Sequence, residues 1–117
     1  MKRGSSPLAT ANAPHYVWGQ ACDGWRLHDT DGLSVIEERM PGGTAEIRHY
    51  HHRSEQVFYV LAGTLSLECD GATHTLSAGA SLSVAAGSPH QAMNVGEDAV
   101  RFLVISAPST RNDRHPS

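Results

Sequence analysis

The sequence predicts an all-β fold from three observations. Apolar residues fall in short segments, several of which alternate with period two, as half-buried strands do. Gly- and Pro-containing turns separate these segments at the roughly 8–12-residue spacing that is typical of a sandwich or barrel. No segment carries its apolar residues at the spacing of an amphipathic helix, so the strands are expected to form the whole core.

Residues 33–40 form the first expected strand of the central region, because they are rich in β-branched and apolar residues and stop at a Pro-Gly-Gly turn. Residues 44–51 follow and alternate, so side chains two apart should share a face. Residues 57–61 are continuously apolar, which is typical of a strand covered on both faces. The other expected strands cover residues 64–69, 73–76, 81–85, 91–95 and 100–106.

One domain is expected, because 117 residues suit a domain of roughly 100 residues with tails. Residues 1–14 and 107–117 are rich in small and polar residues and are expected to be flexible tails around a domain at 15–106. The net charge is only −3 without a basic block, so no nucleic-acid partner is expected. The apolar runs are too short to span a membrane, and a cytoplasmic location is expected.

Three histidines are candidate metal ligands. His49 and His51 lie two apart on an expected strand and share a face with Ile47, which favours an inward orientation. A buried imidazole needs a partner for each ring nitrogen, and a metal ion would satisfy one of them. A titrating surface patch is the alternative. His90 follows a Gly/Pro turn at the start of a distant strand, so three histidines could meet inside a small barrel.

Two motifs that contain these histidines resemble those of the cupin family. Gly43, His49, His51 and Gly63 have the spacing of the family's first motif, G-x5-H-x-H-x3/4-E-x6-G. Gly79, Gly87, His90 and Asn94 have the spacing of the second, G-x5-P-x-G-x2-H-x3-N, with Ala85 in place of its proline. The resemblance covers residues 33–106 and implies a double-stranded β-helix, or small jelly-roll barrel, around one metal ion.

The first motif contains one departure, at the position of its glutamate. Counting back from Gly63 places Gln56 there, whereas counting forward from His51 also permits Glu55. Because residues 57–62 form an uninterrupted strand, Gln56 keeps the register and Glu55 should point outward. The resemblance therefore implies His49, His51, Gln56 and His90 as the metal ligands. Strand parity makes Phe58, Val60, Ile47 and Ala92 candidates for the lining of the cavity, with plain core packing as the alternative.

This ligand set bears on the chemistry. Imidazole ligands suit a divalent transition metal (Zn, Ni, Fe, Cu, Co or Mn) better than Mg or Ca. Neutral ligands leave the metal's charge uncompensated, which favours an anionic small-molecule ligand or substrate. The resemblance implies a metal-dependent enzyme with dioxygenase, isomerase or cyclase-like Lewis-acid chemistry, although no catalytic residue beyond the metal ligands stands out. A non-catalytic binding module and a fold with vestigial histidines are the alternatives.

A homodimer is also expected, because an open sheet edge invites pairing and cupins are commonly dimers. The segment Trp18–Trp25 contains both tryptophans of the chain. It is expected either to cover an edge of the barrel or to be exchanged between subunits.

Overall fold

The computed structural model describes residues 5–117, and these residues form strands without any helix, as predicted. The strands are β1 (His15–Trp18), β2 (Cys22–Asp29), β3 (Ser34–Met40), β4 (His49–Tyr50), β5 (Glu55–Ala62), β6 (Thr64–Cys69), β7 (Ala72–Ser77), β8 (Ser81–Val84), β9 (His90–Met93), β10 (Val100–Ala107) and β11 (His115–Pro116).

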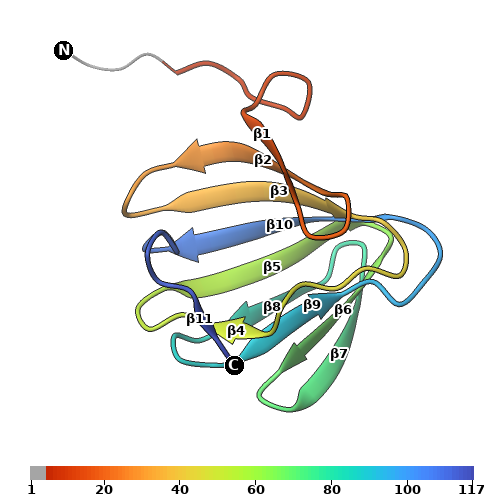
Figure 1. Cartoon of the computed structure of the whole chain (residues 1–117). Helices are drawn as coiled ribbons and strands as arrows, with labels where there is room; N and C mark the ends of the chain where they lie inside the picture. Colours follow the sequence, from red (N-terminus) through yellow and green to blue (C-terminus); the bar gives the residue numbers. More distant parts are fainter. Residues whose placement is uncertain (1–4) are drawn as a thin grey trace.

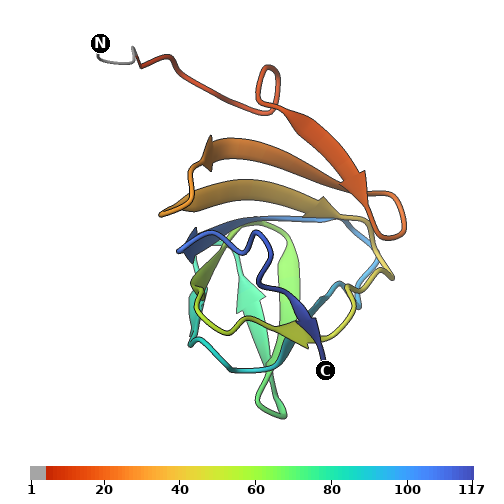
Figure 2. The same ribbon diagram turned by 60° about the vertical axis from the view of Figure 1, so that its left-hand side comes forward.

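The strands form two sheets. One has the order β1-β2-β3-β10-β5-β8 and the other the order β11-β4-β9-β6-β7. Strand β10 lies between β3 and β5 and is antiparallel to both, so the chain returns across the barrel late in the sequence. Figures 1 and 2 show β1 and β2 at one side of the molecule and the β6–β7 hairpin at the opposite end. This arrangement is the double-stranded β-helix, or jelly roll, that the sequence predicts.

The interior of the barrel has an apolar part and a polar part. The apolar core consists of Cys22, Met40, Phe58, Val60, Leu65, Leu67, Leu76, Val84, Ala92, Val100, Phe102 and Val104. At the other end of the large sheet, the cross-strand row Ser34–Ser106–Gln56 is buried as well. Buried polar side chains are costly unless they are paired, so this row marks the part of the interior where a polar site lies.

Two motif residues have structural roles. Gly63 joins β5 to β6 with φ 81°, and a Cβ there would lie 2.7 Å from the carbonyl oxygen of Ala99, so a side chain would be both strained and crowded. Buried Asn94 donates hydrogen bonds to the carbonyls of Met40 (2.9 Å) and Asp98 (2.8 Å). It therefore fixes the turn before β10.

The continuous apolar run at residues 57–61 is not covered on both faces, contrary to the prediction. Phe58 and Val60 are buried, whereas Tyr59 and Leu61 remain 39% and 41% exposed. Their strand, β5, lies in a sheet with only one face toward the core, so its outer side chains meet solvent in a single chain.

Residues 44–51 form a continuous strand in the prediction, but only His49–Tyr50 is regular strand. The preceding part makes a single isolated bridge, between Ala45 and Met93. Alternation does not extend through this irregular segment, and Ile47 is 76% exposed. The prediction that Ile47 faces inward and lines the cavity is therefore wrong.

The C-terminal residues 107–117 differ from the flexible tail expected of them. Strand β10 includes Ala107, and the chain then returns to pair His115 with Tyr50 in β11. Asp113, between the two, is only 2% exposed. In the five-stranded sheet, β11 lies at the edge beside β4, and it therefore covers the open side of that two-residue strand.

The N-terminal hairpin β1–β2 extends the large sheet beyond β3 and contains the Trp18–Trp25 segment. Trp18 packs against the core, so this segment covers a barrel edge within one chain. Residues 5–14 precede the hairpin, and Ala13 among them is buried. Residues 1–4 of the expected N-terminal tail lie outside the described part of the chain.

Candidate metal centre

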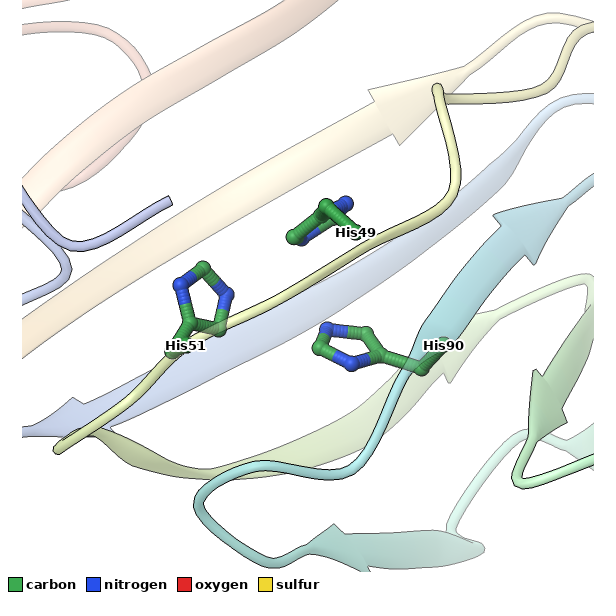
Figure 3. A group of neighbouring side chains, drawn as sticks. All are labelled: His49, His51 and His90. Carbon is green, nitrogen blue, oxygen red and sulfur yellow. The ribbon is translucent and has the colours of Figure 1, made fainter. Parts of the chain in front are cut away.

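The two histidine motifs meet at one place in the barrel. Strands β4 and β9 are neighbours, and His49 lies directly opposite His90 in their register. His51 follows β4 immediately, and all three histidines are at most 3% exposed. Figure 3 shows the three rings directed toward a common point, two from the segment around β4 and one from β9.

The rings are close enough to share one ion. A ligand nitrogen can be chosen on each ring so that all three atoms lie within 4.8 Å of one another. The ring centroids of His49 and His90 are 4.5 Å apart, and those of His49 and His51 are 4.9 Å apart. The three histidines could therefore hold a metal ion, as the sequence predicts.

A backbone carbonyl fixes the tautomer of each ring. His49 Nδ1 lies 2.7 Å from the oxygen of Ile47, His51 Nδ1 lies 2.5 Å from that of Asp113, and His90 Nδ1 lies 2.9 Å from that of Ser88. A carbonyl oxygen only accepts hydrogen bonds, so each Nδ1 carries the hydrogen. Each Nε2 therefore presents a lone pair, and the carbonyls hold the rings as outer partners commonly hold metal-binding histidines.

Burial keeps these rings neutral. Desolvation lowers the pKa of His49 to about 3, with like-charge repulsion from Arg114 and the other two histidines as smaller causes. Desolvation also lowers the pKa values of His51 and His90. At neutral pH a proton therefore does not compete with a metal ion for the three Nε2 atoms.

Gln56 lies beside the histidines, whereas Glu55 does not. The side chain of Gln56 is buried at 6% exposure, and that of Glu55 is exposed, as the strand register predicts. Gln56 Nε2 donates a 3.0 Å hydrogen bond to Ser106 Oγ, so its amide oxygen is the free end. Phe58, two residues further along β5, lines the same cavity, as expected.

Three buried polar atoms within the described residues have no hydrogen-bond partner: His51 Nε2, His90 Nε2 and Gln56 Oε1. An unpaired buried acceptor costs about 1–3 kcal/mol, and native proteins rarely leave several of them together. All three atoms are Lewis bases, and a donor set dominated by imidazole nitrogens suits a divalent transition metal. These residues therefore fit a metal ion. We call His49, His51, Gln56 and His90 the histidine wall.

The cavity beside the histidine wall has a volume of about 160 Å³. Tyr16, Arg26, Glu38 and Arg114 line it together with His49, His51 and Gln56. We call these first four residues the charged wall. The charged wall comes from β1, β2, β3 and the segment before β11, so strands from the N-terminal part and a C-terminal segment line the same cavity. A larger crevice of about 670 Å³ lies between residues 5–8 and β2, without these histidines.

Two glutamates in the cavity titrate near neutral pH. Desolvation raises the pKa of Glu38 to about 8, with repulsion from Glu46 as the next cause. Desolvation also raises the pKa of Glu46 to about 7. Glu46 lies against His49, with 3.9 Å between Oε1 and Nδ1, and one of its oxygens accepts the backbone N–H of Ala92 at 2.8 Å. The cavity thus contains carboxyl groups although the motif glutamate is replaced.

Asp113 connects the C-terminal segment to the site. Its carboxylate accepts the backbone N–H groups of His52 (2.8 Å), Arg53 (2.9 Å) and Ser54 (3.2 Å), while its carbonyl holds His51. These hydrogen bonds, with that to Arg53 first, lower the pKa of Asp113 well below its usual range. The residue therefore positions both His51 and the loop that follows it.

Sequence reasoning missed the charged wall and Asp113. One signal was available for Glu38: Ser34, Ile36 and Met40 share its parity on β3, so a carboxylate stands on an inward face. Arg114 and Asp113 carry no such signal, because they lie in a segment without alternation. Asp113 and Arg114 reach the site only because the C-terminal segment returns to pair with β4.

The described part of the chain holds no helix with the length and apolar character that crossing a membrane requires.

Two curated relatives match the central part of the chain. An uncharacterized protein of Methanocaldococcus jannaschii is 27% identical over 75 residues, which are 64% of this chain and 60% of that protein. The polyketide synthase protein CurC of Streptomyces cyaneus is 35% identical over 79 residues, which are 68% of this chain and 51% of that protein. The chain thus spans between about half and three fifths of the length of these relatives.

Solved structures share the fold at low sequence identity. KdgF from Halomonas sp. has a TM-score of 0.82 and 20% identity, over 92% of this chain and 96% of that one. The polyketide cyclase RemF from Streptomyces resistomycificus has a TM-score of 0.78 and 21% identity, over 99% and 84%. Likeness at this identity shows the fold alone. The family model described as "Cupin domain" matches residues 35–106, and with the double-stranded β-helix and both histidine motifs in place, the chain belongs to the cupin family.

Proposed function

We propose that this chain is a metal-dependent enzyme that acts on a small organic molecule at a divalent transition metal held by His49, His51, Gln56 and His90. The observation that carries this proposal is a set of three unpaired buried lone pairs in the histidine wall, two of them on histidines whose rings could share one ion. A purely structural core would not accumulate unpaired acceptors at this cost.

The residues of the histidine wall would bind the metal ion with side chains whose orientation is already fixed. Each histidine is held by a carbonyl at Nδ1, so little ordering is needed when Nε2 binds. Gln56 would contribute its amide oxygen while Ser106 holds the amide nitrogen. When bound, the metal would supply Lewis-acid chemistry that polarises a carbonyl oxygen of the substrate. Because all four ligands are neutral, the site favours an anionic ligand.

Cyclase-like or isomerase chemistry is the reaction class we favour over dioxygenation. The relative CurC is named a polyketide synthase, and polyketide chains carry carbonyl groups whose neighbouring carbons can be enolised. Glu38, in the same cavity, offers a carboxyl group for proton transfer, which enolisation requires and simple metal binding does not.

Metal analysis tests the site. Untagged protein, purified without chelator, is expected to contain about one transition metal per chain, as expected of a three-histidine catalytic site. His90→Ala should lose this metal, and His74→Ala, which changes an exposed histidine of β7, should keep it. Wild-type protein that stays metal-free after incubation with Zn, Ni, Fe, Cu, Co and Mn salts would contradict the proposal.

Turnover tests the enzymatic part. The metal-loaded protein is expected to convert at least one member of a panel of small carbonyl and enol compounds, and the chelator-treated protein none. A fully loaded protein that binds such compounds without converting any of them would favour the alternative function, a non-catalytic binding module.

A homodimer is part of this proposal. The outer face of the large sheet carries partly exposed apolar side chains on neighbouring strands, including Tyr59, Leu61 and Leu103, and a second copy would cover them. Light scattering during size-exclusion chromatography is expected to give twice the chain mass of 12.5 kDa. The mass of a single chain would overturn this part of the proposal.

A further inference from the structure

The charged wall contains groups that a metal centre does not need. Glu38 lies on the inner face of β3 between Ile36, which lines the cavity, and Met40, which belongs to the core. Its neighbour Glu37 points to the outer face and forms an ion pair with Arg101 there. Glu38 has no such ion pair among the described residues, so its place inside the barrel calls for another explanation.

Tyr16 contacts Glu38 at the cavity. The hydroxyl of Tyr16 donates a 3.5 Å hydrogen bond to Glu38 Oε2. The ring of Tyr16 can lie there because its cross-strand partner is Gly24, where a Cβ would stand 2.3 Å from the ring. The guanidinium group of Arg26 in turn lies 4.6 Å from the centre of the same ring. These contacts place a carboxyl group and a cation side by side at the cavity.

The two arginines of the charged wall give the cavity fixed positive charge. Arginine stays protonated in proteins, and its planar fork matches a carboxylate. Arg114 lies 3.8 Å from Glu46 Oε1, whereas Arg26 forms no ion pair with any described residue. The cavity therefore offers at least one guanidinium group that no described carboxylate contacts as an ion pair, beside a site with only neutral candidate ligands.

We propose that the charged wall binds a small oxo acid, with its carboxylate between Arg26 and Arg114, and that Glu38 transfers the proton when the carbon beside the oxo group is enolised. This inference rests on the proposed function, because polarisation of the carbonyl would be supplied by a metal ion held by the histidine wall. A cavity of about 160 Å³ has the volume of roughly five water molecules, which suits a molecule the size of pyruvate.

The proton transfer is balanced without any further reactant. The C–H bond breaks, the proton moves to a carboxylate oxygen of Glu38, and the electron pair enters the enolate, whose charge rests on the former carbonyl oxygen. The reverse step returns a proton to the carbon. The raised pKa of Glu38, about 8, supports this role, because an acid–base group is most effective when it titrates near the working pH.

Hydrogen–deuterium exchange at the methyl group of pyruvate tests the proton transfer. The metal-loaded protein is incubated with pyruvate in deuterated water, and loss of the methyl signal is followed by proton NMR. Glu38→Gln is expected to lower kcat for exchange about 100-fold with little change in KM and metal content, and Glu38→Asp to restore part of the rate. Glu55→Gln, at an exposed position of β5, is the matched control and should exchange like the wild type.

Pyruvate binding to the metal-free protein tests the arginines separately. Calorimetric titration after chelator treatment is expected to give an affinity about tenfold lower for Arg26→Gln than for the wild type, which corresponds to about 1.4 kcal/mol. Equal affinities would overturn the carboxylate site, and exchange by Glu38→Gln at the wild-type rate would overturn the proton-transfer role.

The two proposals fail in different ways. A fully metal-loaded wild type that does not exchange pyruvate would overturn this inference and leave the metal centre standing. A wild type that binds no metal would overturn the proposed function as well, and elemental analysis recognises that case before any exchange is measured.

Discussion

The two walls of the cavity are held in different ways. In the histidine wall, every imidazole donates its Nδ1 hydrogen to a backbone carbonyl at 2.5–2.9 Å, and Gln56 is bound to Ser106. In the charged wall, the side chains are long, the Tyr16–Glu38 hydrogen bond measures 3.5 Å, and Arg114 is 54% exposed. One wall is therefore preorganised, whereas the other can adapt to a ligand.

The walls also differ in their relation to the family. The whole histidine wall lies within the matched residues 35–106, whereas Tyr16, Arg26 and Arg114 lie outside them. The shared core thus supplies the candidate metal centre, and the flanking segments supply most of the groups that would recognise a ligand. This division fits a fold on which many activities have been built.

The largest effect is expected where the histidine wall depends on a flanking segment. Asp113→Ala removes the acceptor of three backbone N–H groups and loosens the carbonyl that orients His51. Metal affinity should fall about 10- to 100-fold, as when an outer partner of a ligand is lost. Competition with a chromogenic chelator measures it. Asp98→Ala, at an exposed turn, is the control, and equal affinity of the two variants would count against the positioning role.

Substitutions of Gln56 test whether its side chain is one of the metal ligands in the histidine wall. Gln56→Glu places a negative charge beside a divalent ion and should tighten metal binding about tenfold or more, whereas Gln56→Leu should weaken it to a similar extent. The same competition titration measures both variants. If all three side chains gave one affinity, Gln56 would not be a ligand.

Gly24→Ala disturbs the charged wall alone. The added Cβ would lie 2.3–2.6 Å from the ring and hydroxyl of Tyr16, so the tyrosine must move away from Glu38. The free energy of unfolding should fall by about 1–3 kcal/mol in urea titrations, with metal content unchanged. Gly32→Ala is the matched control, because nothing lies within 4 Å of a Cβ there. Metal loss in Gly24→Ala would show that the two walls are coupled.

The stability of the metal-free protein should also depend on pH. The pKa of Glu38 is raised to about 8 in the folded state, so the folded state keeps a proton that the unfolded state releases above the ordinary pKa of 4.5. Its stabilising contribution is complete below that value and is lost as the pH rises to 8. Glu38→Gln should therefore gain stability relative to the wild type as the pH rises from 5 to 9, which urea titrations at a series of pH values measure. A difference that is independent of pH would contradict the shift.

The sequence was sufficient for the barrel and for the histidine wall because both depend on local patterns. Turn spacing and alternation predict the strands, and strand parity decides that Gln56 is buried and Glu55 exposed. The same rule failed at Ile47, because residues 44–48 are irregular. Parity describes a residue's face only where the strand is continuous.

The charged wall could not be predicted because it depends on contacts between distant segments. Arg114 reaches the cavity only because β11 pairs with β4, and a two-residue strand leaves no periodic signal. Tyr16 reaches Glu38 only because the register of β1 and β2 sets it opposite Gly24. Such pairings are decided by the assembled sheets and not by local sequence.

One feature of the histidine wall affects the rate at which a metal ion could leave it. The carbonyls that hold His49 and His90 lie two residues before each ring, in the same stretch of chain, whereas the carbonyl that holds His51 belongs to Asp113. The orientation of the His51 ring therefore depends on the docking of the C-terminal segment against β4. If an ion binds there, its release and the amide exchange of that segment should share one barrier, the undocking of the C-terminal segment.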